Sequence, residues 1–207
     1  MPAVLADFKQ RKQTLLAQCA REQSLARAAS VHRHLRWLSD LCDESLSALW
    51  QHSEMPQTFA LLAVGGYGRQ ALFPYSDVDV LVLLPNDIDL QAHPELKEKV
   101  ETFIGRCWDM GLEIGSSVRQ QQECLAEALA DITVQTALLE SRHITGSAAL
   151  SESFQKAFQT QLDPRAFFTG KTLEMHQRHS KFENTPYALE PNCKESPGGL
   201  RDLQMLL

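Results

Sequence analysis

Two aspartates at the beginning of an apolar run are the residues in this sequence best suited to chemistry. Asp77 and Asp79 open the segment DVDVLVLL, which is rich in valine and leucine and predicts a strand over residues 77–84. Side chains two apart on a strand point to the same side, so the two carboxylates share one face with Cα atoms about 7 Å apart. Like charges at that spacing repel each other, and a hard divalent cation with oxygen ligands, most simply Mg²⁺, relieves the repulsion.

A glycine-rich turn precedes the aspartates. The continuously apolar run 59–64 predicts a strand buried on both faces, and Gly65, Gly66 and Gly68 follow it in GGYGR. Glycine lets the backbone take positive φ and approach a ligand closely, and exposed N–H groups beside two carboxylates suit a metal-bound polyphosphate. An isolated glycine pair or D-x-D is usually an ordinary turn or a solvated acid pair. The complete arrangement of strand, GG-x-G-R, S-D-x-D and second strand favours a catalytic site.

The run GGYGRQALFPYSDVD resembles the nucleotide-binding signature of the DNA polymerase β-like nucleotidyltransferases. Within that superfamily it is most similar to the family of bacterial PII-protein uridylyltransferase/uridylyl-removing enzymes. A second segment, EPNCKESPGGLRDLQ at residues 190–204, is similar to that family's run after the catalytic core. The resemblance covers most of the chain from about Leu61 onward. It departs at Gln70 and Ala71, where the family has Gly-Glu, and at Ser116, where histidine is usual; these positions bear on fine substrate contacts.

The resemblance implies a Mg²⁺-dependent transfer of UMP from UTP to a tyrosine of the PII nitrogen-regulatory protein, with release of pyrophosphate. It implies a two-metal site in which Asp77 and Asp79 ligate Mg²⁺, completed by a third carboxylate on a neighbouring strand. Glu113 is the candidate for that third acid, and the competing interpretation is that Glu113 is solvated on an open sheet face. Gly65 and Gly66 are expected to hold the triphosphate through main-chain amides.

Four further residues are expected to contact phosphates or to orient the substrates. Arg69 and Ser76 lie between the glycine turn and the aspartates. They are expected to bind phosphate or to orient the substrate, in a role secondary to that of the aspartates and the glycines. Lys194 lies in the long loop 184–199, and Arg201 lies in the helix expected after it, whose start is a favourable anion position. The resemblance favours a role for both toward nucleotide phosphates or toward the protein substrate. For Lys194 and Arg201, a surface loop with ordinary charges is the competing interpretation.

The remaining pattern predicts the elements that position these residues. Helical spacing of apolar residues predicts two helices before the sheet, at about 4–23 and 28–51, and one at 94–110. Strict alternation predicts a half-buried strand at 112–119. Further helices are expected at 121–130 and 132–141, an edge strand at 143–145, and a helix starting at Asp163-Pro164. The expected fold is α/β (α+β), a small mixed sheet of the polymerase β-like nucleotidyltransferase type with flanking helices and helical extensions at both ends.

Three segments are expected along the chain. They are an N-terminal helical segment over 1–52, a nucleotidyltransferase core over 53–146, and the start of a truncated helical domain over 147–207. The truncation is inferred from Leu206-Leu207, which end the chain inside an apolar helical run. No His-Asp dipeptide occurs, so the uridylyl-removing hydrolase domain of the resembled family is expected to be absent.

His176 and His179 are interpreted as solvated.

Composition narrows the class of protein. With 43% hydrophobic and 22% charged residues, the 207-residue chain predicts an ordinary globular protein of one or two domains. The net charge of −6 argues against a nucleic-acid partner. Five scattered cysteines without a CxxC pair indicate reduced thiols, and neither a signal peptide nor an apolar run of membrane-spanning length is present. A cytoplasmic protein with no membrane partner is expected.

Three other functions fit part of the pattern. A nucleotidyltransferase acting on another protein or on a small molecule would keep the metal site but lack the KESPGGLRD segment. A non-catalytic regulatory module would bind nucleotide without turnover, and a purely structural brace would tolerate replacement of both aspartates. No residue can be tied to uracil by pattern, so the base specificity comes from the resemblance alone.

Overall fold

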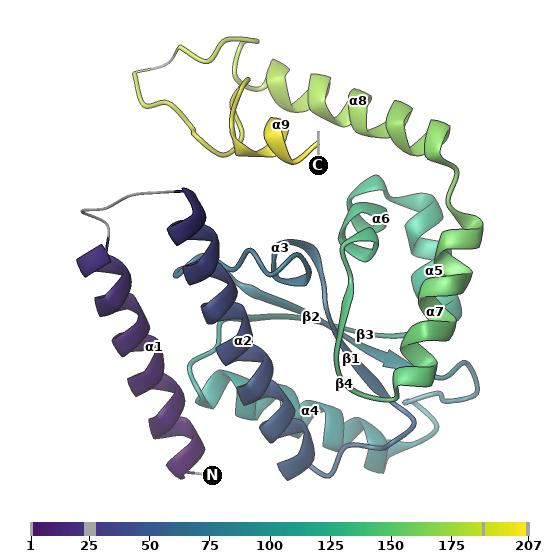
Figure 1. The fold of residues 1–207 in the computed structure, drawn as a ribbon. Coiled ribbons are helices and arrows are strands. Elements are labelled where there is room, and N and C mark those ends of the chain that lie inside the picture. The colour runs from purple at the N-terminus through teal and green to yellow at the C-terminus, as the bar shows by residue number, and fades with distance from the viewer. Residues whose placement is uncertain (1, 23–27, 188, 206–207) are drawn as a thin grey trace. The chain divides into compact units, whose positions relative to one another are not determined.

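The computed structural model describes residues 2–22, 28–187 and 189–205 of the chain. Its elements are α1 Pro2–Glu22, α2 Ala28–His52, β1 Ala60–Ala63, α3 Gly65–Gly68, β2 Val78–Leu84, α4 Pro94–Asp109, β3 Ile114–Gln120, α5 Gln121–Ala130, α6 Ile132–Leu139, β4 Arg142–Gly146, α7 Ala148–Gln161, α8 Pro164–Ser180 and α9 Leu200–Gln204 (Figure 1). The expected end at Leu206-Leu207 lies outside the described residues. None of the helices in the described ranges is long and apolar enough to cross a membrane.

The chain divides into two compact units, Met1–Phe158 and Gln159–Leu207. The helices α1 and α2 therefore belong to the same unit as the sheet. The finer division of the chain at residues 52 and 146, expected from the sequence, stays a prediction.

The first unit is built on a four-stranded mixed sheet with the strand order β3-β2-β1-β4. β1 pairs antiparallel with β2 and with β4, and β2 pairs parallel with β3. The helix α4 makes the crossover that the parallel β2–β3 pair requires. The mixed sheet expected from the sequence is confirmed, and β4 is the edge strand expected near residues 143–145.

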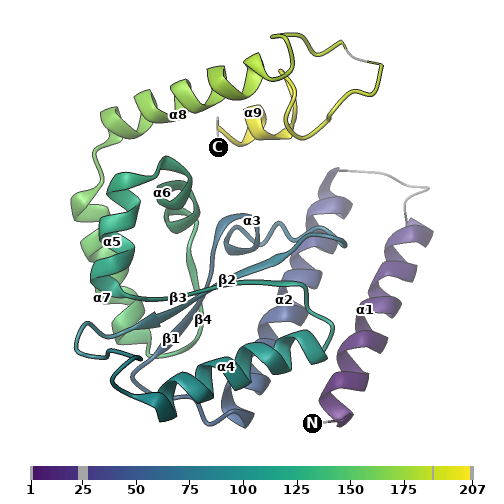
Figure 2. The same cartoon turned by 180° about the vertical axis from the view of Figure 1, so that it is seen from behind.

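The helices α2 and α4 lie side by side along one face of the sheet (Figures 1 and 2). Between them Trp50 and Phe103 meet edge to face, with ring centroids 5.3 Å apart. Alternate strand residues complete this core, namely Leu61, Ala63, Val78, Val80, Val82 and Leu84. Leu62, Leu81 and Leu83, which lie between these residues on the strands, are at most 1% exposed. The central strands are therefore buried on both faces, as their continuous apolar runs indicate.

Side-chain caps set the starts of two helices at the expected positions. Asp131 precedes α6 and accepts a hydrogen bond from the N–H of Thr133 at 2.6 Å. Asp163 precedes α8 and accepts one from the N–H of Arg165 at 2.9 Å, with Pro164 at the first helical position. Both caps satisfy N–H groups that have no partner inside the helix.

Candidate active site

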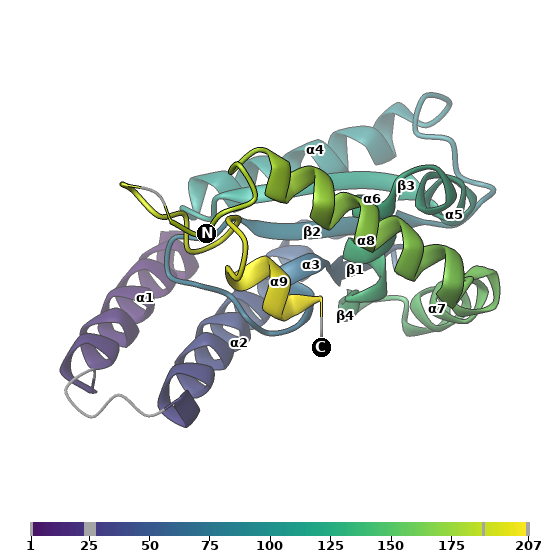
Figure 3. The ribbon, with the colours of Figure 1, turned by 90° about the horizontal axis from the view of Figure 1, so that it is seen from above.

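The register of the sheet brings the glycine turn next to the second aspartate. The backbone N–H of Val64 donates to the carbonyl oxygen of Asp79 at 3.1 Å, one residue beyond the Ala63–Val80 pair of the β1–β2 ladder. Gly65 follows at once and begins α3, which lies beside β1 and β2 (Figure 3). The turn and the aspartate are therefore neighbours through backbone pairing, which does not depend on any side-chain rotamer.

The glycine turn leaves main chain open to a ligand. Gly65 has φ +56°, in the left-handed region that favours glycine, and a Cβ added there would meet no atom within 4 Å. A Cβ added to Gly66 would come no closer than 3.8 Å to any other group. Because the first N–H groups of a helical turn have no acceptor within the turn, this open main chain is suited to an anion.

Asp77 and Asp79 have exposed side chains where β2 begins. Asp77 lies in the bend before the strand, and Asp79, within the strand, pairs with Gly115 of β3 in the parallel ladder. A Cβ added to Gly115 would lie 2.3 Å from Oδ1 of Asp79, so the carboxylate occupies the space that a side chain on β3 would fill. Gly115 was not among the residues singled out from the sequence. A glycine inside a strand pattern does signal close approach, but the pattern does not name the approaching group.

Glu113 and Ser76 lie near the start of β2. The N–H of Val78 donates to the carbonyl oxygen of Glu113 at 2.8 Å, and the side chains of Glu113 and Ser76 are exposed. Both residues line a small cavity of about 40 Å³. Among the described residues, no group of three or more His, Cys, Asp and Glu side chains could hold a metal ion. The role of Glu113 as a third ligand therefore stays a prediction.

The oxygen atoms at the site can supply some of the ligands of a hard cation. Asp77 and Asp79 supply exposed carboxylate oxygens, which Mg²⁺ prefers, and the open main chain of the glycine turn lies beside Asp79. Mg²⁺ usually takes only one or two carboxylates and completes its coordination with water and substrate phosphates. Two protein carboxylates are therefore chemically sufficient for a nucleotide-bound ion.

The turn is tightly packed against the end of α6. A Cβ added to Gly68 would lie 2.0 Å from the carbonyl oxygen of Glu140, which follows α6. The guanidinium of Arg69 forms an ion pair with the carboxylate of Glu140, and both side chains are less than one third exposed. Arg69 is thus engaged by a protein carboxylate beside the turn, and its expected role toward phosphate stays a prediction.

Lys194 and Arg201 belong to the second unit. Lys194 is exposed, and its backbone N–H donates to the side-chain oxygen of Asn192 at 3.0 Å. The Nε of Arg201 lies 3.4 Å from Oε1 of Glu195. Contacts of Lys194 and Arg201 with nucleotide phosphates stay predictions.

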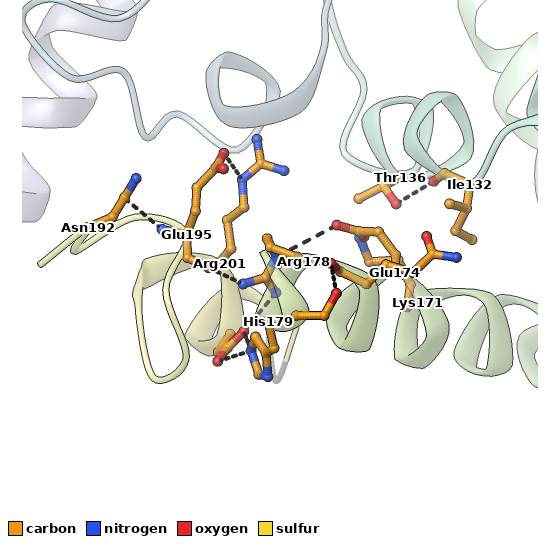
Figure 4. Close-up of polar contacts among 12 residues, drawn as sticks. Ile132, Thr136, Lys171, Glu174, Arg178, His179, Asn192, Glu195 and Arg201 are labelled. Atoms are coloured by element: carbon orange, nitrogen blue, oxygen red, sulfur yellow. Dashed lines mark hydrogen bonds and ion pairs between the residues drawn. The ribbon is translucent and has the colours of Figure 1, made fainter. Parts of the chain in front are cut away.

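Asp202 fastens the KESPGGLRD segment to α8. Its carboxylate accepts hydrogen bonds from Nη2 of Arg178 and from the N–H of Gly198, each at 2.7 Å, and lies 2.8 Å from Nε2 of His179. Arg178, which is 6% exposed, also donates to the carbonyl oxygen of Glu195 at 2.9 Å (Figure 4). Burial acts to raise the pKa of Asp202, but these hydrogen bonds outweigh it and the pKa is lowered. His179 is paired with Asp202, so the interpretation of His179 as solvated is wrong. The two residues are 23 apart in sequence, and no local pattern reveals such a contact.

Comparisons with known proteins match both motif-bearing parts of the chain. Residues 44–134 match the Nucleotidyltransferase domain family, and residues 166–207 match the GlnD PII-uridylyltransferase family. The chain is 55% identical over 202 residues to a bifunctional uridylyltransferase/uridylyl-removing enzyme of Burkholderia lata, and 55% identical over 203 residues to one of Burkholderia mallei. Each match covers 98% of this chain, and the chain spans only 22% of each relative's length.

Solved structures give a more distant likeness. A crystal structure of a toxin-antitoxin with AMP-PNP is 14% identical, with a TM-score of 0.35, and the match covers 69% of this chain and 96% of that one. The segments with GGYGR and KESPGGLRD both lie inside the family matches, so the expected resemblance is confirmed. The chain carries a nucleotidyltransferase domain and is a homologue of the amino-terminal region of the bifunctional uridylyltransferase/uridylyl-removing enzymes.

Proposed function

We propose that this chain carries the nucleotidyl-transfer site of a PII-protein uridylyltransferase, which moves UMP from UTP to a tyrosine hydroxyl of a PII signalling protein. The observation that carries the proposal is the register that sets the Gly65-Gly66 turn beside Asp79, with Asp77 exposed next to it. The nucleotide and the acceptor come from the names of the relatives and of the matching family. A cytoplasmic protein with no nucleic-acid partner is part of the same proposal.

The transfer forms one bond and breaks one. The tyrosine oxygen attacks the α-phosphorus of UTP, and the bond from that phosphorus to the oxygen bridging to the β-phosphate breaks, so pyrophosphate leaves with the bonding electrons. The proton of the tyrosine passes to solvent or to a nearby carboxylate, for which Glu113 is the candidate. The main chain of Gly65 and Gly66 holds the triphosphate and keeps the leaving group in line with the attacking oxygen.

The two aspartates would hold the cations that offset the negative charge of the triphosphate. Asp77 and Asp79 would hold Mg²⁺, and the site would take two ions when nucleotide is bound. Mg²⁺ held by these carboxylates would supply positive charge to balance the leaving pyrophosphate and to favour ionisation of the attacking hydroxyl. Without a cation, the exposed carboxylates repel the triphosphate, so nucleotide binding itself is expected to depend on Mg²⁺. Arg69 and Ser76 serve as orienting groups at the edge of the site.

The test is a transfer assay with purified protein, Mg²⁺, a PII-type acceptor and each of the four nucleoside triphosphates labelled at the α-phosphate. We expect label from UTP on the acceptor, lost when a chelator is added or when the acceptor tyrosine is replaced by phenylalanine. The double variant Asp77→Asn with Asp79→Asn is expected to abolish transfer and to leave the fold intact. Unchanged transfer by that double variant would overturn the mechanism. Label from another nucleotide, or on a different acceptor, would replace the substrate assignment while keeping the site.

A further inference from the structure

Behind the glycine turn, three residues that are far apart in sequence form one polar cluster, which we call the turn brace. It consists of Asp43 on α2, Tyr67 within α3 and Arg142 at the start of β4. The hydroxyl of Tyr67 donates to Oδ1 of Asp43 at 2.5 Å. The guanidinium of Arg142 donates to both oxygens of the same carboxylate, at 2.6 Å and 3.1 Å. The forked, charge-assisted geometry makes these the stronger kind of hydrogen bond.

Arg142 also reaches the main chain of the turn. Its Nε donates to the carbonyl oxygen of Gly68 at 3.3 Å, and its guanidinium carbon lies 5.6 Å from the ring centroid of Tyr67. The backbone of Arg142 pairs with Ala63, two residues before the turn begins. The brace therefore fixes the turn through its one large side chain, through one of its carbonyl groups and through the strand that leads into it.

The charges of the brace are matched. Tyr67 is 1% exposed, and burial together with the charge of Asp43 raises the pKa of its hydroxyl, so the hydroxyl stays a hydrogen-bond donor. Burial acts to lower the pKa of Arg142, but its hydrogen bonds to Asp43 outweigh that effect, and its pKa is raised. Asp43 is therefore the common acceptor of the cluster, and its removal leaves a half-buried cation and a buried hydroxyl without their partner.

The composition of the turn explains why an external brace is needed. The sequence of α3 is Gly-Gly-Tyr-Gly, so Tyr67 is the only side chain that can anchor it. Glycine loses more conformational freedom on folding than any other residue, and a turn with three glycines has little rigidity of its own. Holding the triphosphate in line, in contrast, requires N–H groups fixed within a fraction of an ångström.

We propose that Asp43, Tyr67 and Arg142 are positioning residues for the nucleotide, which hold the main chain of Gly65 and Gly66 in place beside Asp79. They act through the turn and do not touch the substrate. This inference rests on the proposed function, in which the turn holds the triphosphate.

The test compares the affinity for nucleotide with the turnover number in variants of the brace. Tyr67→Phe removes only the hydroxyl, and Asp43→Asn removes the charge while keeping the shape. We expect the KM for UTP to rise about tenfold in Tyr67→Phe and more in Asp43→Asn, with a smaller change in kcat. Calorimetric titration with UTP and Mg²⁺, without acceptor, should show the same loss of affinity. Arg142→Lys keeps the charge without the fork and should restore part of the affinity lost in Arg142→Ala.

A matched control breaks a different ion pair of the same unit. Glu127→Gln removes the partner of Arg119, an ion pair of 2.8 Å between α5 and β3, and should leave KM unchanged. Tyr67→Phe is the conservative variant and keeps the test decisive if Asp43→Asn fails to fold. Folded brace variants with unchanged KM and unchanged affinity for UTP would overturn the inference, even if their melting temperature fell. A separate result would overturn the proposed function, namely transfer that survives in the double variant Asp77→Asn with Asp79→Asn.

Discussion

The Oδ1 atom of Asp79 lies where a side chain on Gly115 would have to go, since a Cβ there would be 2.3 Å away. Gly115→Ala is therefore expected to push the carboxylate out of place. A displacement of about 1 Å can cost roughly 100-fold in rate, so we expect transfer to fall by about that factor. The melting temperature should change little, because Asp79 is exposed. The measurement is the rate of label transfer beside a thermal melt.

Gly105→Ala is the control for that substitution. Gly105 lies inside α4, and a Cβ there would meet nothing within 4 Å. Alanine in a helix interior should stabilise the protein by about 0.5–1 kcal/mol and leave transfer unchanged. Full activity in Gly115→Ala would show that the site accommodates a displaced Asp79.

The third glycine of the turn is expected to matter for stability. In Gly68→Ala, the new Cβ would lie 2.0 Å from the carbonyl oxygen of Glu140, which is main chain and cannot rotate away. The variant should lose about 1–3 kcal/mol of unfolding free energy in urea. Gly66→Ala, whose new Cβ would come no closer than 3.8 Å to its neighbours, should stay within about 0.5 kcal/mol of the parent. Equal stability of the two variants would contradict the close packing of the turn on α6.

The two aspartates should matter for activity and not for folding. Asp77 and Asp79 are exposed like charges, so replacing both by asparagine should leave the melting temperature unchanged or slightly raised. Transfer, in contrast, should disappear. Asp87→Asn, at an exposed acid in the loop after β2, should keep full transfer. A large drop in stability of the double variant would indicate a structural role for the pair.

The fastening of the KESPGGLRD segment should depend on pH. The pKa of Asp202 is lowered in the folded state, so its stabilising contribution is fully present above the unfolded value of about 4 and is lost as the pH falls from there through the lower folded value. Asp202→Asn should remove the contribution at every pH. The measurement is limited proteolysis of residues 190–199, faster in Asp202→Asn than in the parent at pH 7. Glu190→Gln, at an exposed acid of the same loop, should behave like the parent, and equal proteolysis of all three would rule out the fastening.

Four of the five thiols should fall into two classes, with the partly exposed Cys19 outside both. Burial raises the pKa of Cys42, Cys107 and Cys124 to about 12, whereas Cys193 is exposed. At pH 8 a thiol reagent should label Cys193 within seconds to minutes and the three buried thiols only after unfolding. In a chain that also carries Cys19→Ser, Cys193→Ser should remove the fast phase, and a fast phase that persists at a buried cysteine would show local opening of the core.

The sequence predicted the elements whose signals are local. β2 follows from a continuous run of valine and leucine, and the start of α8 follows from Asp163-Pro164, because apolar pattern and capping depend on neighbouring residues. The proximity of the glycine turn to Asp79 was also predictable, since the turn follows directly on β1 and Asp79 lies at the start of β2, and the antiparallel pairing of the two strands brings these ends together. These predictions needed no contact between distant parts of the chain.

The contacts that hold the turn were not predictable in the same way. Asp43 reads as one polar residue on an amphipathic helix, and its partner Arg142 is 99 residues away. Tyr67 stands out within GGYG as the only side chain, which is a signal that it is anchored, but its acceptor is on another element. Such pairings are set by how the helix and strands pack, and a single sequence carries no direct record of that packing.

Because Arg142 follows the turn by many residues in sequence, the turn is synthesised well before the side chain that holds it in place. A ribosome that has released residues up to the end of β2 has already produced every glycine of α3 and both aspartates, yet neither the edge strand nor its guanidinium exists. Because long-range pairing has to wait for both partners to emerge, we expect the nascent chain to acquire affinity for nucleotide only after β4 has left the exit tunnel. Competence for binding would then appear in a single step, at the point of translation where β4 emerges.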